Sequence, residues 1–132
     1  MSGPARAAQI LLLLFGVGFI ILGLRYFADP HALTAESNVA VPDAKAVMEI
    51  RTVYGGMFFG LGLSLLVMAV RRELRRAGLW LLMLVAGSVA VARLIAIALG
   101  QAPDLMFASL LGIELVGVAI AAYLLRAVKA GC

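Results

Sequence analysis

Four side chains that could hold a small polar group stand in or beside long apolar segments of this 132-residue chain. Arg51 and Tyr54 open an uncharged run that ends at Val70, and their spacing of three places them on one face of a helix. Arg93 and Glu114 each stand alone inside an apolar segment. Ionisable residues in such surroundings are costly to bury and commonly mark function. These four residues are therefore the candidate polar cluster, either ligand-binding or structural.

Arg93 and Glu114 are expected to lie at similar depths. Arg93 precedes Gly100 by seven residues, ~10 Å along a helix, and Glu114 follows Leu105 by nine, ~13 Å. If these two segments are antiparallel neighbours, the side chains can meet. Each isolated charge would cost about 2.5–3.5 kcal/mol near a helix centre. Two interpretations stay open: an ion pair that fixes helix register, and an outward-opening polar pocket that holds a ligand head group.

Arg51 is a second candidate cation for Glu114, and the Tyr54 hydroxyl is a further candidate partner. Two arginines against one glutamate would leave a positive excess, which favours an anionic or carbonyl-bearing group. Glu49 lies two residues before Arg51 and is expected to point to another side.

The chain offers little for catalysis or for metal binding. Its single histidine, His31, has no neighbouring ligands, and its single cysteine is the terminal Cys132. Metal sites need three or more clustered donors, and one cysteine makes neither an intrachain disulfide nor a CxxC motif. We expect no metal, no cofactor and no catalytic residue, so a non-enzymatic role is favoured.

Composition predicts an integral membrane protein. Hydrophobic residues make up 64% of the chain and charged residues 14%, with a mean hydropathy of +1.10. Soluble domains are closer to about 45–50% apolar and about 25% charged. Four apolar stretches approach the ~20 residues that cross hydrocarbon; they cover about residues 7–27, 47–70, 77–100 and 105–126. The second helix is expected to begin earlier than its apolar stretch, because Pro42-Asp43 is a favourable helix start. The fold class is therefore all-α, a four-helix transmembrane bundle in one membrane domain over residues 1–132.

Basic residues predict the orientation of this bundle. Seven of the eleven lysines and arginines lie before the first segment, between the second and third, and after the fourth. The positive-inside rule makes that side the cytoplasm, with both termini inside and the loop of about residues 28–46 outside. Basic residues placed between apolar segments do not form a nucleic-acid surface. Membrane lipids are the expected partners, in a bacterial inner membrane.

Small residues predict close helix contacts. Four-residue spacing recurs in the second segment at Thr52, Gly56, Gly60 and Ser64, and in the fourth at Gly117 and Ala121. Such stripes let helix backbones approach. The residues assigned to helix packing are Gly55, Gly56, Gly60, Ser64 and Gly117.

The sequence "EIRTVYGG" at residues 49–56, with an arginine in the third segment and a glutamate in the fourth, resembles a family of small bacterial four-helix membrane proteins. That family is known as a domain of unknown function. The resemblance covers about residues 8–126, and its R-x-x-Y-G-G element is the most specific part. It implies a four-helix inner-membrane protein without an established activity, in which the residues that match the pattern are Arg51, Tyr54, Gly55, Gly56, Arg93 and Glu114. At the level of fold alone, the layout is similar to DoxX-like proteins and to the small scaffold protein of fungal sterol biosynthesis.

Three classes of function follow from these features. The first is a non-enzymatic protein that binds a small amphiphile or lipid, or that serves as an accessory subunit of a larger membrane complex or homo-oligomer. The second is a small proton- or cation-coupled transporter that uses Glu114. The third is an intramembrane enzyme, with Glu114 or Tyr54 as acid–base group and Arg93 as electrophile.

Overall fold

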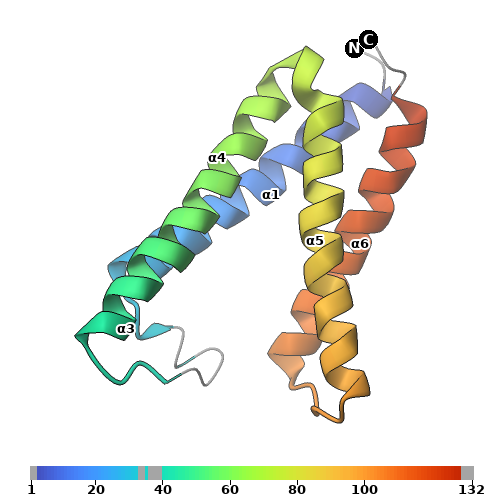
Figure 1. The fold of residues 1–132 in the computed structure, drawn as a ribbon. Helices are drawn as coiled ribbons and strands as arrows, with labels where there is room; N and C mark the ends of the chain where they lie inside the picture. The colour runs from blue at the N-terminus through green and yellow to red at the C-terminus, as the bar shows by residue number, and fades with distance from the viewer. Residues whose placement is uncertain (1–2, 33–34, 36–39, 129–132) are drawn as a thin grey trace. The chain divides into compact units, whose positions relative to one another are not determined.

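A computed structural model of the protein describes residues 3–32, 35 and 40–128. Its elements include α1 (Gly3–Ala28), α3 (Ala44–Glu49), the π-helix η1 (Ile50–Gly55), α4 (Gly56–Val70), the 3₁₀ helix η2 (Arg72–Leu74), α5 (Arg75–Ala98) and α6 (Leu105–Ala127) (Figure 1). These described residues contain no strand. The predicted all-α fold is confirmed.

Four helices are long and apolar enough to cross a membrane: Gly3–Ala28, Ala44–Val70, Arg72–Ala98 and Leu105–Ala127. The second begins at Ala44, as the Pro42-Asp43 pair predicted, and the Asp43 carboxylate caps α3 by accepting a hydrogen bond from the Ala46 N–H at 2.9 Å. Asp104 caps α6 in the same way through the Phe107 N–H, at 2.7 Å. The protein is a multi-pass membrane protein, and its orientation in the membrane stays a prediction.

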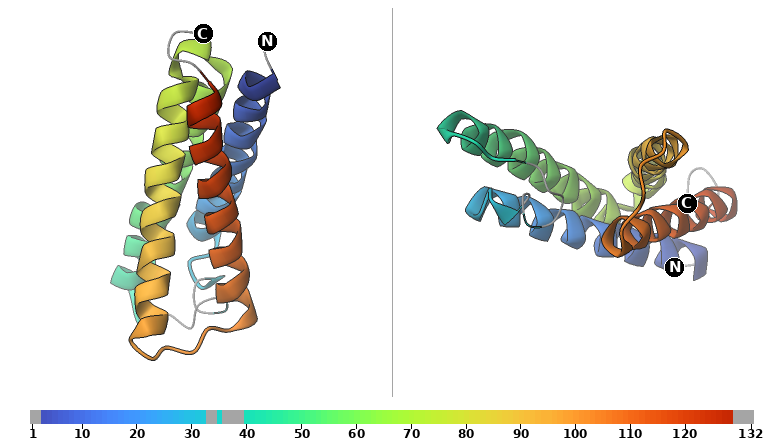
Figure 2. Two further views of the ribbon diagram at one scale, coloured as in Figure 1. Left: turned by 90° about the vertical axis from the view of Figure 1, so that its right-hand side faces the viewer. Right: turned by 90° about the horizontal axis from the view of Figure 1, so that it is seen from below.

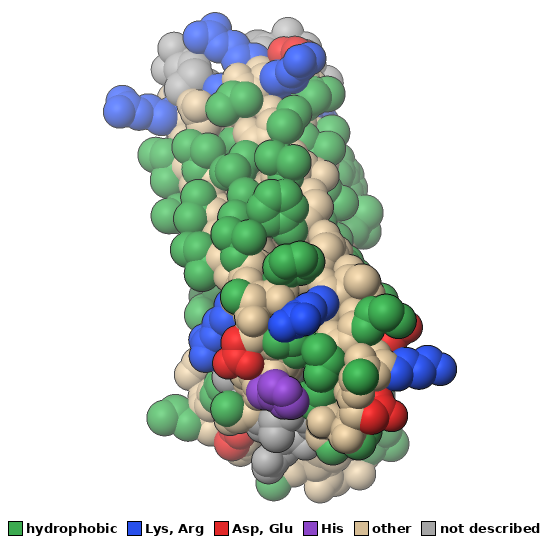
Figure 3. Space-filling view, turned by 90° about the vertical axis from the view of Figure 1, so that its left-hand side faces the viewer, with side chains coloured by type: hydrophobic (Ala, Val, Ile, Leu, Met, Phe, Trp, Pro, Cys, Tyr) green, Lys and Arg blue, Asp and Glu red, His purple; other side chains and the backbone are tan. Residues whose placement is uncertain are grey.

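The outward faces of these helices are apolar. Large hydrophobic side chains remain exposed on every spanning helix, among them Leu14, Leu63, Leu84 and Val116. Figure 3 shows hydrophobic side chains over the middle of the face in view, with lysines and arginines toward its ends. An apolar surface of this kind suits hydrocarbon and would be a liability in water.

The described residues form two compact units, one of residues 13–67 and one of residues 3–12 with 68–128. In the first unit, α1 and α4 pack glycine against glycine. A Cβ built on Gly23 would lie 2.5 Å from the Phe59 nitrogen and 2.8 Å from the Gly55 oxygen, and one built on Gly62 would lie 2.6 Å from the Gly16 oxygen. The glycines are seven residues apart on each helix, which is the repeat of a coiled-coil contact. We call this contact, Gly16 and Gly23 against Gly62 and Gly55, the glycine seam.

The predicted four-residue stripe is not the face that α4 turns toward α1. A Cβ on Gly56 or Gly60 would have no heavy atom within 4 Å, and the Ser64 hydroxyl donates to the Gly60 carbonyl of its own helix at 2.8 Å. The seam follows a seven-residue spacing through Gly55, so a stripe drawn at four-residue spacing falls on another side of α4. In α6, Gly117 is buried.

In the second unit, α5 and α6 run side by side as neighbours (Figures 1 and 2). Between them the chain turns through Gly100, whose φ of 92° lies in the left-handed region that glycine adopts without strain. At the opposite end of α5, a Cβ on Gly78 would lie 2.8 Å from Leu12 Cδ1 and 2.9 Å from Met68 Cβ. The start of α1 therefore packs against the start of α5.

The first two residues of α5, Arg75 and Arg76, donate hydrogen bonds to carbonyls at the ends of other helices. Arg75, a buried residue, donates from Nε to the Ala69 carbonyl near the end of α4, at 2.9 Å. Arg76 donates from Nη1 to the Leu125 and Val128 carbonyls at the end of α6, at 2.9 and 2.8 Å. The last carbonyls of a helix have no partner within the helix, and a cation suits the negative end of the helix dipole. These arginines therefore stabilise the ends of α4 and α6, in addition to belonging to the basic cluster from which the orientation is predicted.

Candidate functional site

Arg93 of α5 and Glu114 of α6 form an ion pair within the second unit. The Arg93 Nε donates to both carboxylate oxygens of Glu114, at 3.1 and 3.2 Å. Their side chains are 22% and 16% exposed, so each is mostly withdrawn from the surface. Because α5 and α6 are neighbours joined by a short turn, residues at similar distances from that turn are brought together.

Phe107 completes this group of side chains. The Arg93 Cζ lies 4.8 Å from the centre of the Phe107 ring, which is a cation–π contact. Contacts of this type contribute about 0.5–1 kcal/mol when exposed and about 2 when desolvated. Phe107 was not among the predicted site residues. Its spacing of seven from Glu114 places both on one face of α6, and that was the available signal.

The Arg93 guanidinium uses only part of its hydrogen-bonding capacity. Its Nε–H is taken by Glu114, whereas among the described residues Nη1 and Nη2 make no hydrogen bond. A guanidinium carries five N–H donors, so four remain. Each Glu114 oxygen accepts one hydrogen bond and keeps further lone-pair capacity. The edge of the pair therefore presents donors and acceptors together.

Apart from the pair, no other charged residue lies in α5 or α6 outside the first turn of α5 and the last turn of α6. Between residues 77 and 125 the sequence holds only Arg93, Glu114 and Asp104, and Asp104 is the cap at the start of α6. The Ser88 and Ser109 hydroxyls donate to carbonyls of their own helices, at 2.9 and 2.7 Å. The charge that α5 and α6 contribute around the pair is therefore balanced, one positive against one negative.

Arg51 has a partner in its own unit. Its Nε donates to the Phe27 carbonyl at 3.1 Å, one residue before the end of α1. A cation at this place satisfies a terminal carbonyl and suits the helix dipole. Arg51 belongs to the first unit and the Arg93–Glu114 pair to the second, so a single cluster that also includes Tyr54 stays a prediction.

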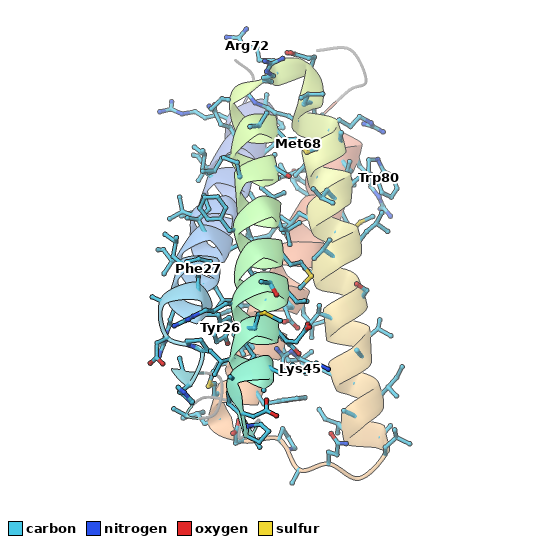
Figure 4. All side chains as sticks on the ribbon, turned by 60° about the vertical axis from the view of Figure 1, so that its left-hand side comes forward. Tyr26, Phe27, Lys45, Met68, Arg72 and Trp80 are labelled. Atoms are coloured by element: carbon cyan, nitrogen blue, oxygen red, sulfur yellow. The ribbon has the colours of Figure 1, made fainter. Side chains whose placement is uncertain are left out.

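Tyr54 packs on α1 as well. Its ring lies edge-on to the ring of Tyr26, with centroids 6.4 Å apart and an interplanar angle of 80°. Tyr26 is buried in a small core with Ile50 and Ala32, and Figure 4 labels it beside α4. Gly55, the next residue of the motif, meets Gly23 in the glycine seam. The "IRTVYG" stretch therefore contacts α1 through an apolar residue, a carbonyl cap, an aromatic pair and a glycine.

The same stretch forms the π-helix η1. Its Thr52 hydroxyl donates to the Met48 carbonyl at 2.8 Å, which satisfies a backbone acceptor of the preceding turn. π-helical turns are rare in proteins overall, and those that occur are often found near functional sites.

The described residues contain no group of three or more histidine, cysteine, aspartate or glutamate side chains that could hold a metal ion. His31 is exposed, and its backbone N–H donates to the Asp29 carboxylate at 3.1 Å.

Comparison with known families shows which family the chain belongs to. The model of the family described as Domain of unknown function (DUF4345) matches residues 7–125, so the chain belongs to this family. The expected membership of a domain-of-unknown-function family is thereby confirmed. No curated protein and no solved structure matches the chain.

Proposed function

We propose that this member of the DUF4345 family binds the head group of a small amphiphile inside the membrane, at Arg93, Glu114 and Phe107. The observation that carries the proposal is the attachment of the Arg93 guanidinium through Nε alone. A structural arginine–carboxylate pair gains most from two parallel N–H···O bonds made by two nitrogens. Here the carboxylate shares a single N–H, and the terminal fork of Arg93 is left for another acceptor.

The surrounding hydrocarbon makes the free donors of Arg93 costly to leave without an acceptor. Polar groups without partners in hydrocarbon cost several kcal/mol each, in order of magnitude. The Arg93 side chain is 22% exposed, so water reaches only part of it. An oxygen of a ligand head group placed on Nη1 or Nη2 would satisfy these donors, while an apolar tail would lie among lipid chains.

The same geometry supports binding over transport. Both oxygens of Glu114 accept from Arg93, so a coupled transporter would have to break this pair in each cycle to load an ion on the carboxylate. Binding of a head group at the free edge of Arg93 leaves the pair intact. We therefore place the protein among non-enzymatic binders, with the site toward the side that the positive-inside rule makes external.

Extraction of the purified protein tests the proposal. The wild-type protein, the double variant Arg93→Gln/Glu114→Gln and the control Arg126→Gln would be purified from membranes in mild detergent and analysed by mass spectrometry. Arg126 is exposed at the end of α6, so its variant controls for the loss of one arginine.

We expect an amphiphile in near-stoichiometric amount with the wild-type protein and with Arg126→Gln, and its loss from the folded double variant. An equal lipid content in all three proteins would contradict head-group binding. A protein subunit that co-purifies with all three, without any such amphiphile, would favour the accessory-subunit alternative instead.

A further inference from the structure

We infer that the head group held at Arg93 and Glu114 is uncharged and combines a carbonyl oxygen with a hydroxyl, as in a glycerol ester. The inference rests on the proposed function and names the chemical class of its ligand. The sequence alone favoured an anionic head group, because Arg51 and Arg93 together outnumber Glu114. The inference differs because it counts only Arg93 and Glu114, the two charges that the second unit brings together.

The charge balance of the pair carries the first step. Arg93 and Glu114 are the only charged residues in α5 and α6 between their terminal turns, and they neutralise each other. An anionic head group would add an uncompensated charge in a medium of low dielectric constant. It would also approach the Glu114 carboxylate, which shares the same arginine, and like charges at close range repel. An uncharged head group brings neither cost.

The remaining donors and acceptors carry the second step. Among the described residues, Nη1 and Nη2 of Arg93 are free to donate, and the Glu114 oxygens can each accept again. A carbonyl oxygen matches the guanidinium and accepts without a charge. A neighbouring hydroxyl can donate to the carboxylate. A head group with only acceptors, such as a simple ester or ketone, would use half of the site.

Phe107 sets the direction of approach. Its ring centre lies 4.8 Å from the Arg93 Cζ, so a ligand oxygen reaches the terminal nitrogens from a side that the ring leaves open. Hydrogen bonds from a guanidinium lie in the plane of the group itself, where a carbonyl oxygen can accept from both terminal nitrogens. The edge of the plane beyond Glu114 is therefore the binding edge.

Three probes with one tail and different head groups test the inference: 1-oleoylglycerol, oleate and oleyl phosphate. Binding to the purified, delipidated wild-type protein would be measured in mixed micelles at a pH where both anions are ionised. We expect 1-oleoylglycerol to bind at least about tenfold more tightly than either anion, a difference of about 1.4 kcal/mol. The control variant Arg126→Gln, which changes an exposed residue at the end of α6, should bind like the wild-type protein.

Arg93→Lys and Arg93→Gln/Glu114→Gln locate the binding. Lysine keeps the positive charge beside Glu114 but lacks the planar fork, so we expect a loss of about tenfold or more for 1-oleoylglycerol. The double variant should lose the same binding without leaving an unpaired charge, and thermal unfolding would verify that each variant is folded.

The outcomes distinguish the inference about the charge of the head group from the proposed binding function. If oleate or oleyl phosphate binds as tightly as 1-oleoylglycerol and depends on Arg93, the inference about charge is wrong and the binding function stands. If no probe shows binding that depends on Arg93, the proposed function fails, and the inference fails with it.

Discussion

Replacement of Gly23 by alanine should force α1 and α4 apart. The added Cβ would lie 2.5 Å from the Phe59 nitrogen, 2.8 Å from the Gly55 oxygen and 3.0 Å from the Phe59 Cα. All three atoms belong to the backbone of the facing helix, so no side-chain rotation relieves the overlap. Ordinary contact begins near 3.4 Å, and the helices must separate locally by several tenths of an ångström.

The expected cost follows from the close packing of the glycine seam. Overpacking of a tight contact costs about 1–3 kcal/mol, and gaps of 0.5–1 Å forfeit roughly a quarter to a half of each dispersion contact that they open. Gly18 supplies the matched control, because it lies on the same helix and a Cβ there meets nothing within 4 Å. Both variants gain the same helix propensity, at most about 1 kcal/mol. We therefore expect Gly23→Ala to be about 1–3 kcal/mol less stable than Gly18→Ala.

Reversible unfolding by sodium dodecyl sulfate in mixed micelles, followed by circular dichroism, measures this difference. A graded series strengthens the test. Gly62→Ala should also destabilise, since its Cβ meets backbone atoms of Gly16 and Ile20 at 2.6 and 2.7 Å. Gly16→Ala should cost less, because its nearest neighbour at 2.8 Å is the end of the flexible Leu66 side chain. Equal stability of Gly23→Ala and Gly18→Ala would refute the glycine seam.

Three further predictions concern the arginine caps and the orientation. Arg76→Gln removes two hydrogen bonds to the end of α6 and should cost about 1–2 kcal/mol, with faster amide exchange in the last turn of α6. Arg72, in the 3₁₀ helix η2 just before α5, is exposed (Figure 4), so Arg72→Gln should stay within about 0.5 kcal/mol of the wild-type protein; equal effects of these two variants would contradict the capping role. Arg51→Gln should uncap α1 and cost about 0.3–1 kcal/mol in the same unfolding assay, whereas no loss would mean that the Phe27 carbonyl needs no cap. Reporter fusions in the loop of residues 28–46 should read external and fusions after α6 cytoplasmic, and the reverse pattern would overturn the orientation.

The spanning helices were predictable from the sequence because a bilayer demands about 20 apolar residues in each. The contact of Arg93 with Glu114 was accessible for a related reason. Two charges in otherwise apolar, antiparallel neighbours at similar depths have few other partners. Hydropathy alone does not mark the start of the second span, but the Pro42-Asp43 pair did, because aspartate at an N-cap is a local signal that the sequence carries.

Other contacts left no signal in the sequence. The partner of Arg51 is a backbone carbonyl, and since every residue carries one, no residue type marks the place. The chain has 14 glycines, which define several stripes, and the four-residue spacing of Gly56 and Gly60 was as regular as the seven-residue spacing of Gly55 and Gly62. Only the position of α1 shows that Gly55 and Gly62, rather than Gly56 and Gly60, form the helix contact. The π-helix likewise depends on the backbone hydrogen bonds of one turn.

A double-mutant cycle on Arg93 and Glu114 tests the central claim most directly, because the site exists only if these residues meet in the membrane. Arg93→Gln and Glu114→Gln should each destabilise by roughly 1–3 kcal/mol, since each leaves its partner as an unpaired charge in poorly hydrated surroundings. The double variant should lose clearly less than the two single losses combined, because no unpaired ion remains. Small, additive losses would contradict the ion pair, and the head-group site would fall with it.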